Sequence, residues 1–139
     1  MKILNLGSLN IDRVYGVDHF VRAGETISSN TYTLFPGGKG LNQSVALARA
    51  GAQVYHAGCV GEDGGMLTEL MADSGVNLKY LKTDSVAPTG HAAIQVTPQG
   101  QNCIIIYGGA NDLVSPDYID SVLSNFAAGD ILLLQNEVS

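Results

Sequence analysis

Short apolar segments alternate with polar, glycine-containing segments along the chain, and this alternation predicts successive strands and helices. An apolar run at residues 3–9 leads into polar side chains, as expected of a buried strand followed by a turn. From Leu41 onward, apolar residues recur with helical spacing until Gly51 ends the pattern. Apolar runs at residues 54–60 and 131–134 have the character of further buried strands.

Two more helices are predicted after the first. One covers residues 67–74 and would end at Gly75. The other covers residues 118–126, where Pro116 suits the first turn and Gly129 the end. Strands that alternate with helices through short connections predict an α/β fold, in which helices flank a parallel sheet and the crossovers are right-handed.

A second kind of β structure interrupts this rhythm. Residues 91–97 and 103–107 are strand-like, and the turn-like segment PQGQN joins them without room for a crossover helix. This hairpin should therefore lie outside the main sheet. Further short strands are predicted near residues 14–17 and 31–35.

Composition narrows the class of protein. The chain has 139 residues, of which 45% are apolar and 14% charged, so it can form a compact domain with a buried core. Its formal net charge of -6 argues against nucleic-acid binding. No apolar run approaches the ~20 residues that span a bilayer, and the first residues lack the pattern of a signal peptide. We expect a soluble, cytoplasmic protein that binds neither nucleic acid nor membranes.

The cysteines and histidines give no sign of a metal site. Cys59 and Cys103 each lie in an apolar stretch and have no CxxC spacing, which predicts two buried thiols in a reducing compartment. The three histidines are isolated from one another in the sequence, so we assign none of them to a metal: His19, His56 and His91.

The segment FPGGKGLNQSVALARAG at residues 35–51 places three glycines and a lysine ahead of a helix. A Walker A loop has the pattern GxxxxGK[ST], but here Lys39 is followed by Gly40. A dinucleotide-binding motif has GxGxxG directly after the first strand, where this chain has GSLN. The loop fits neither of these phosphate-binding patterns.

A site for a polyol is the remaining interpretation of this loop. Gly37 and Gly38 would let the backbone approach a small ligand, and Asn42 offers both a donor and an acceptor. Asp12 could accept hydrogen bonds from neighbouring hydroxyls, and Asn10 would point to the same side of an extended strand. Taken alone, these residues also fit ordinary turns and an ordinary helix entry.

Several further motifs accompany the loop, and together they resemble the amino-terminal half of the ribokinase (PfkB) family of carbohydrate and nucleoside kinases. The similarity covers the whole chain. It rests on GSLNID at 7–12, AGET at 23–26, FPGGKGLNQSVALARAGAQV at 35–54, VGEDG at 60–64, TGHAAI at 89–94, GGAN at 108–111 and LLLQNE at 132–137. Two features depart from the family: a short connection at residues 62–66, and Arg22-Ala23 where proline is common.

The resemblance implies a sugar-binding site and names its residues. The positions that match the family's sugar pocket are Asn10, Asp12, Gly37, Gly38, Lys39, Asn42 and Glu137. Because all of them are retained, a pentose is the expected substrate, with ribose first. The resemblance also implies a small β-sheet lid, with strands from about residues 13–35 and 90–108, and a homodimer formed through the lids.

The resemblance also implies what this chain lacks. The family's DTxGAGD region, with the catalytic base and the anion hole, does not occur in the sequence, so we assign no catalytic residue to this chain. ATP, Mg²⁺ and K⁺ are expected to bind in the carboxyl-terminal half of the intact enzyme. We therefore expect residues 1–139 to be an amino-terminal, sugar-binding part that is inactive alone. Two alternatives stay open: a non-catalytic protein that binds a sugar or nucleoside, and a nonfunctional truncated fragment.

Overall fold

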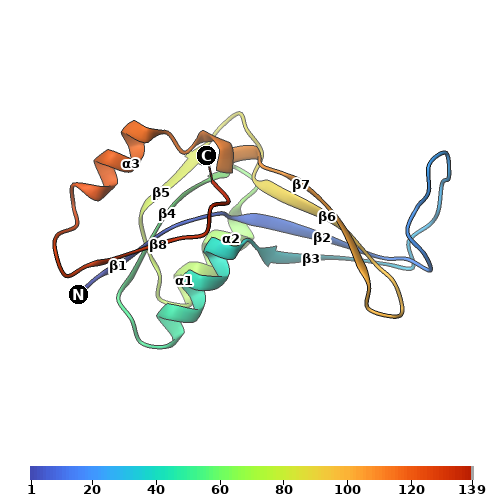
Figure 1. Ribbon diagram of the computed structural model, residues 1–139, viewed down its shortest axis with the longest axis horizontal. Helices are drawn as coiled ribbons and strands as arrows, with labels where there is room; N and C mark the ends of the chain where they lie inside the picture. Colours follow the sequence, from blue (N-terminus) through green and yellow to red (C-terminus); the bar gives the residue numbers. More distant parts are fainter. Residues whose placement is uncertain (139) are drawn as a thin grey trace.

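The computed structural model describes residues 1–138 and contains two four-stranded sheets, the second of which extends away from one end of the first (Figure 1). We call the first the main sheet. All of its strands are parallel and follow the order β5-β4-β1-β8. Its strands are β1 (Ile3–Leu6), β4 (Val54–Gly61), β5 (Asn77–Asp84) and β8 (Ile131–Leu134).

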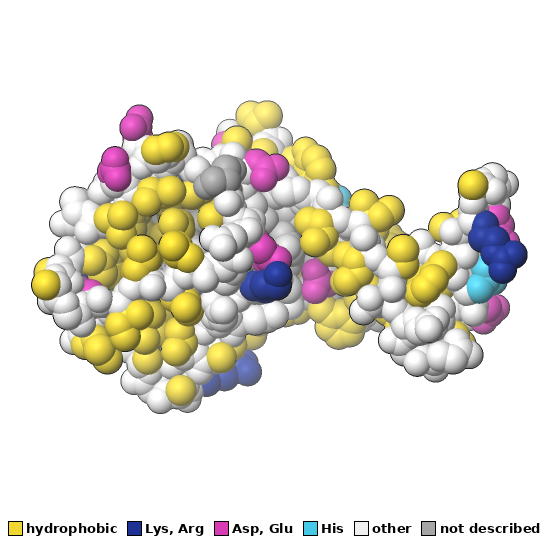
Figure 2. Space-filling model, viewed as in Figure 1, with side chains coloured by type: hydrophobic (Ala, Val, Ile, Leu, Met, Phe, Trp, Pro, Cys, Tyr) yellow, Lys and Arg dark blue, Asp and Glu magenta, His cyan; other side chains and the backbone are white. Residues whose placement is uncertain are grey.

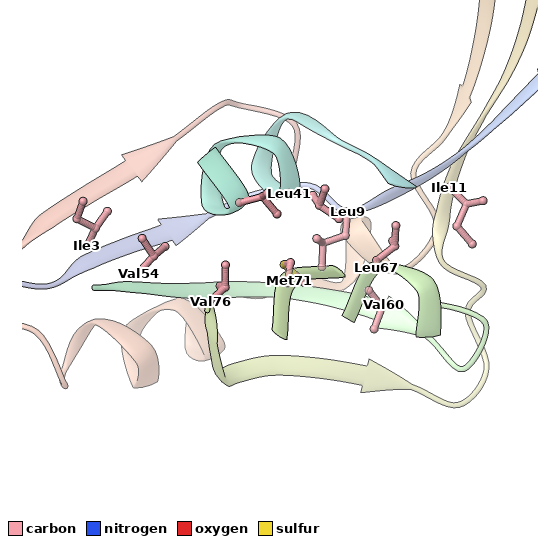
Figure 3. Close-up of a cluster of buried hydrophobic side chains, with 10 residues drawn as sticks. Ile3, Leu9, Ile11, Leu41, Val54, Val60, Leu67, Met71 and Val76 are labelled. Carbon is pink, nitrogen blue, oxygen red and sulfur yellow. The ribbon is translucent and has the colours of Figure 1, made fainter. Parts of the chain in front are cut away.

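Helices cover both faces of the main sheet, as the alternation of strands and helices predicts. Helices α1 (Lys39–Arg49) and α2 (Gly65–Asp73) lie on one face, while the 3₁₀ helix η1 (Gly109–Leu113) and α3 (Pro116–Leu123) lie on the other. Figure 3 shows apolar side chains from α1, α2 and the strands filling the space between them. The members of this cluster are Ile3, Leu9, Ile11, Leu41, Val45, Val54, Val60, Leu67, Met71 and Val76.

Helix α3 packs on the opposite face of the main sheet. Hydrogen bonds cap its first turn and attach it to the strands. The Ser115 hydroxyl accepts a hydrogen bond from the Tyr118 backbone N–H, which caps the helix, and Pro116 occupies its first turn. The buried Tyr118 hydroxyl donates to the carbonyl oxygen of Tyr80 and accepts from the Gly58 N–H at 3.0 Å. Burial raises the pKa of Tyr118 to about 12. These bonds tie α3 to β4 and β5.

The second sheet has the order β3-β2-β6-β7, with one parallel pair, β2 and β6, between two antiparallel pairs. Its strands are β2 (Asn10–Gly16), β3 (Thr31–Gly37), β6 (Gly90–Val96) and β7 (Asn102–Tyr107). The two edge strands, β3 and β7, are largely exposed to solvent. The hairpin of β6 and β7 lies outside the main sheet, which confirms that prediction.

Two expectations about strands are wrong, and one strand was not predicted. Residues 3–9 form no single strand, because the chain leaves the main sheet after β1 and enters the second sheet at Asn10. Strand β5 has no predicted counterpart, since its lysines, Lys79 and Lys82, break the apolar pattern at the edge of the sheet. Strand β8 is less buried than its composition suggests, because it lies at the other edge. Figure 2 shows hydrophobic side chains gathered on that side of the molecule.

The two cysteines differ in environment. Cys59 is buried in β4, as predicted, but Cys103 is exposed, and the prediction of a second buried thiol is wrong. The reason is that Cys103 lies on β7, an edge strand whose side chains are all exposed. Among residues 1–138, no helix combines the length and apolarity that crossing a bilayer requires.

Candidate functional site

The candidate site forms where β1 ends, β2 begins and α1 begins, and its backbone segments touch directly. A Cβ atom at Gly40 would lie 2.5 Å from the backbone of Gly7 and Ser8. Gly38 adopts a φ of 97°, and a Cβ there would lie 2.6 Å from the Ser8 carbonyl oxygen. The Leu41 N–H donates to that same oxygen at 3.0 Å. Glycine is thus required at both positions, because a side chain would separate the two segments.

Asp12 lies over the glycines of this loop. It is on β2, two residues after Asn10, so the two side chains share one face of the strand. A Cβ at Gly37 would lie 2.3 Å from the Asp12 carboxylate, so the carboxylate occupies the space above Gly37. Burial raises the pKa of Asp12, and the negative charge of Glu137 raises it further. Asp12 is therefore a partly buried acceptor that is harder to ionise than an exposed aspartate.

Asn10 lies between two glycine positions and contacts a residue from η1. It pairs with Gly37 on one side and Gly90 on the other. Its Oδ1 accepts a hydrogen bond of 2.9 Å from Nδ2 of Asn111, a residue that is only 2% exposed. Asn111 also bonds the backbone of Leu9 through both of its amide atoms. The Asn10 side chain is thus held from below by a buried amide.

Lys39 and Glu137 form an ion pair between α1 and the segment after β8. Lys39 Nζ lies 2.8 Å from Glu137 Oε1, and the Lys39 side chain is 68% exposed. The other carboxylate oxygen accepts from the Ser8 hydroxyl at 2.7 Å and from the Lys39 backbone N–H at 3.4 Å. Burial raises the pKa of Glu137, but the hydrogen bonds from Lys39 and Ser8 outweigh it and hold the pKa below its usual range.

The structure therefore brings the predicted site residues together in two groups. Asn10, Asp12 and Gly37 adjoin on the second sheet, and Lys39 and Glu137 adjoin at the start of α1. Gly38 connects the groups. Asn42 lies in the first turn of α1 with an exposed side chain, which forms no hydrogen bond with other residues of the described chain.

A buried polar network lies beneath the glycine loop. Asn5 donates to the Gly40 carbonyl oxygen at 2.7 Å and to the Ser44 hydroxyl at 2.8 Å. The Ser44 hydroxyl is 2.8 Å from His56 Nδ1, and His56 Nε2 is 3.2 Å from the Gly7 carbonyl oxygen. Donation from Ser44 to Nδ1 leaves the Nε2–H to bond Gly7. The network thus joins Gly7 and Gly40 from below.

His56 is neutral in this network. Burial lowers its pKa from 6.5 to about 4, although the hydrogen bond with Gly7 opposes the change. At the far end of the network, Gln135 Nε2 donates to Asn5 Oδ1 at 2.5 Å and to Gln43 Oε1 at 2.6 Å. The segment after β8 therefore reaches the glycine loop through two partly buried side chains, Glu137 and Gln135.

Sequence reasoning missed several of these residues. Ser8 and Asn111 lie within GSLNID and GGAN, so the motifs could have indicated them. His56 gave no signal, because its partners Asn5 and Ser44 are distant in sequence and each is unremarkable alone.

The site combines hydrogen-bond acceptors with hydrogen-bond donors. Carboxylates accept from hydroxyl groups, whereas amide and ammonium groups donate to them. Within residues 1–138, no cluster of three or more metal-ligating side chains occurs. A hollow of about 530 Å³ lies elsewhere on the second sheet, beneath residues 21–29, and shares none of the site residues. The chemistry of the site therefore favours a polyhydroxylated ligand.

Comparison with known proteins gives a consistent family. Residues 1–139 match the model of the pfkB family carbohydrate kinases. A ribokinase of Haemophilus influenzae is 38% identical over 134 residues, which cover 95% of this chain and 44% of that protein. The chain thus spans less than half the length of this relative.

Solved structures agree with the sequence match. The ribokinase of Arabidopsis thaliana complexed with ribose and ATP has a TM-score of 0.82 and 37% identity, over 99% of this chain and 46% of that one. The ribokinase of Cryptococcus neoformans in complex with ADP has a TM-score of 0.81 and 40% identity, over 99% of this chain and 41% of that one. Both kinases are more than twice as long as the matched region.

Proposed function

Because the chain belongs to the pfkB family of carbohydrate kinases, we propose that it forms the sugar-binding part of an ATP-dependent kinase that phosphorylates the primary hydroxyl of a pentose, with ribose first. One observation carries this proposal: the Asp12 carboxylate lies over Gly37, on the same face of β2 as Asn10. An acceptor and an amide on one face of a strand can bind neighbouring hydroxyls.

Each group in the site has a part in holding the sugar. Asp12 accepts hydrogen bonds from hydroxyls, while Gly37 leaves room for the Asp12 carboxylate and Gly38 lets the loop pack against the Ser8 backbone. The exposed Asn42 amide and the pair of Lys39 and Glu137 contact the remaining hydroxyls. Together they fix the sugar so that its primary hydroxyl is oriented for attack, which is a large part of catalysis in phosphoryl transfer.

The nucleotide and its ions are assigned to another part of the enzyme. ATP supplies the phosphoryl group, and Mg²⁺ and K⁺ accompany it. From the family resemblance, we place these sites, and the catalytic base, in the region of the longer relatives that this chain does not span. The 139-residue chain alone is thus expected to bind sugar without turnover.

The second sheet is proposed as a lid over the sugar, and as the surface of a homodimer. Cross-strand register places Phe35 and Ala92 beside Asp12, with Ile106 beside Ala92, so all four lie on one face. Phe35 and Ile106 are exposed and apolar. They would close over the sugar and exclude water from the reaction. A second lid packed against the exposed strands would bury the apolar residues that a single chain leaves in solvent.

The test is a kinase assay on the gene product that contains this chain, with ribose and ATP. Asp12→Ala should lower kcat/KM for ribose by about 10- to 150-fold, because a hydrogen bond to a charged group contributes about 1.5–3 kcal/mol. Asp117→Ala, which removes an exposed carboxylate from α3, is the matched control and should change little. Unchanged kcat/KM in Asp12→Ala would refute the assignment of the sugar site. Ribose binding by the gene product without ADP formation would instead indicate a non-catalytic sugar-binding protein.

A further inference from the structure

We propose that Asn111 is a positioning residue that fixes the side-chain amide of Asn10, so that Asn10 meets the sugar only as a hydrogen-bond donor. The proposal rests on the sugar site proposed above and concerns its selectivity. Asn111 is on η1 and is not one of the residues proposed to contact the sugar. Its contacts determine an orientation that a lone asparagine would leave open.

The first step is the orientation of Asn111, which the backbone settles. The Leu9 N–H donates to Asn111 Oδ1 at 3.0 Å, and Asn111 Nδ2 donates to the Leu9 carbonyl oxygen at 3.1 Å. A backbone N–H can only donate and a carbonyl oxygen can only accept. The reversed amide would therefore lose both bonds in a buried place, so Nδ2 of Asn111 must be the atom beside Leu9 O.

The second step is the orientation of Asn10, which follows from the first. The remaining hydrogen of Asn111 Nδ2 points to an acceptor on Asn10, and Oδ1 lies there at 2.9 Å. The bond is packed tightly over Gly90, where a Cβ would lie 2.2 Å from Asn111 Nδ2 and 2.4 Å from Asn10 Oδ1. Gly90 therefore leaves just enough space for the two amides, and Asn10 Oδ1 is committed to Asn111.

The third step concerns the free atom of Asn10. Its Nδ2 forms no hydrogen bond with other residues of the described chain, and it is not among the buried side-chain atoms that lack a partner. The atom thus remains reachable by a ligand, although Asn10 as a whole is only 8% exposed. Asn10 presents two N–H donors to the site and no acceptor.

The consequence is a complementary pair on one strand. Asp12 lies two residues further on the same face of β2. In its ionised form it offers acceptors and no donor. A hydroxyl group has one hydrogen to donate and lone pairs that accept, so a single hydroxyl, or two neighbouring ones, can accept from Asn10 and donate to Asp12. With the Asn10 amide reversed, both residues would present acceptors and compete for the same hydrogen. Asn111 therefore selects for a hydroxyl, and against its deoxy analogue, without touching the sugar.

The test begins with the free protein and needs no sugar. In the full chain labelled with ¹⁵N-asparagine, hydrogen exchange of the side-chain amides should be slow at Asn111 Nδ2, whose hydrogens bond buried acceptors, and at least about tenfold faster at Asn10 Nδ2. Equal rates, or slower exchange at Asn10, would contradict the proposed orientation. This measurement uses the wild-type chain, so it stands even if substitutions at Asn111 impair folding.

The second measurement is calorimetric titration with ribose, 2-deoxyribose and 3-deoxyribose. Asn111→Asp keeps the shape of the side chain but removes the Nδ2 donor, so the Asn10 amide can turn. We expect ribose binding to weaken about tenfold, and the preference for ribose over one of the two deoxy sugars to shrink. Asn77→Asp introduces the same change at an exposed position, where Oδ1 caps the Lys79 N–H, and should behave as wild type.

The outcomes separate this inference from the function on which it rests. If wild type binds ribose and Asn111→Asp keeps the same affinity and the same preference over both deoxy sugars, Asn111 has no positioning role and the inference fails. If wild type binds none of the sugars, the proposed sugar site fails, while the exchange rates still decide the orientation of Asn10. Loss of affinity with an unchanged preference would show a merely structural role and would also overturn the inference.

Discussion

The main sheet and the second sheet have four strands each, yet they expose their side chains very differently. Helices cover the main sheet on both faces, and its central strands β1 and β4 are almost wholly buried. In the second sheet, all six residues of β7 are exposed, among them Ile104, Ile105 and Ile106. Such a run of exposed apolar residues is unusual in a strand that faces only water.

This difference suggests that the two sheets serve different purposes, the main sheet stability and the second sheet ligand binding. The main sheet supplies the packed core on which folding depends, because most of the buried apolar side chains lie against it. The second sheet carries Asn10, Asp12 and Gly37, and its apolar residues remain available for other contacts. Substitutions in the main sheet should therefore mainly lower the free energy of unfolding. Substitutions in the second sheet should mainly affect ligand binding.

The largest expected effect compares one apolar side chain in each region. Leu67 on α2 is fully buried against the main sheet, whereas Ile105 on β7 is 69% exposed. Leu67→Ala should lower the free energy of unfolding by about 2–5 kcal/mol, and Ile105→Ala should change it by less than about 0.5 kcal/mol. Urea denaturation of both variants measures this. Similar losses would mean that the second sheet is part of the cooperative core.

The next effect is the response of the main sheet to acid. The pKa of His56 is about 4 in the folded protein, below its ordinary value of 6.5, so only the unfolded chain takes up a proton between these values. The contribution of His56 to the free energy of unfolding should therefore be at its maximum above pH 6.5. It should fall by about 3 kcal/mol as the pH drops to 4. This part of the pH dependence should disappear in His56→Gln.

The matched control for His56 comes from the second sheet. His91 is on β6, where it is only partly buried, and its ring centre lies 5.2 Å from that of Tyr107 in a tilted arrangement. His91→Gln should keep the wild-type decline in stability between pH 6.5 and 4, measured by urea denaturation at several pH values. If His56→Gln shows the same decline as wild type, other groups cause it and the neutral, buried state of His56 is refuted.

A smaller effect compares two glycines, each at the beginning of a helix. A Cβ at Gly40 in α1 would meet the backbone of Gly7 and Ser8, while a Cβ at Gly65 in α2 would meet nothing within 4 Å. Gly40→Ala should cost about 1–3 kcal/mol of stability through overpacking. Gly65→Ala should be neutral, or stabilise by about 0.4–1 kcal/mol, because it restricts the unfolded chain. Equal thermal shifts would show that the contact at Gly40 is loose.

The smallest expected effect has the opposite sign. Burial and the charge of Glu137 raise the pKa of Asp12, so its ionised form opposes folding at neutral pH, and stability is lost as the pH rises through that pKa. Asp12→Asn should raise the melting temperature slightly at pH 7 and should weaken ribose binding. A lower melting temperature would indicate that Asp12 is a structural residue and not one strained for binding.

The sequence predicts those elements whose apolar spacing and terminal residues match the environment that the fold gives them. Helix α1 follows from its apolar spacing and from the glycines before it, and α3 from Ser115 and Pro116. The edge strand β5 was missed because it has lysines where a buried strand has apolar residues. The exposure of Cys103 was missed because the apolar run in β7 resembles a buried strand, although it lies at an edge.

The candidate site shows the same limit. The glycine loop and the pair Asn10 and Asp12 are visible as short motifs, because residues two apart share one face of a strand. The approach of Glu137 to Lys39 depends on the pairing of β8 with β1, which no local pattern encodes. Only the family resemblance named Glu137 as a site residue. The orientation of Asn10 depends on hydrogen bonds from a residue about a hundred positions away.

The contact between Glu137 and Lys39 also sets the order in which the site can be completed during synthesis. The two residues are 98 positions apart, and β8 must emerge before the carboxylate can reach the loop. At about 5–20 residues per second, a ribosome needs roughly 5–20 s to make the intervening chain. The glycine loop is therefore made well before its carboxylate partner, and this ion pair can form only after β8 has been synthesised.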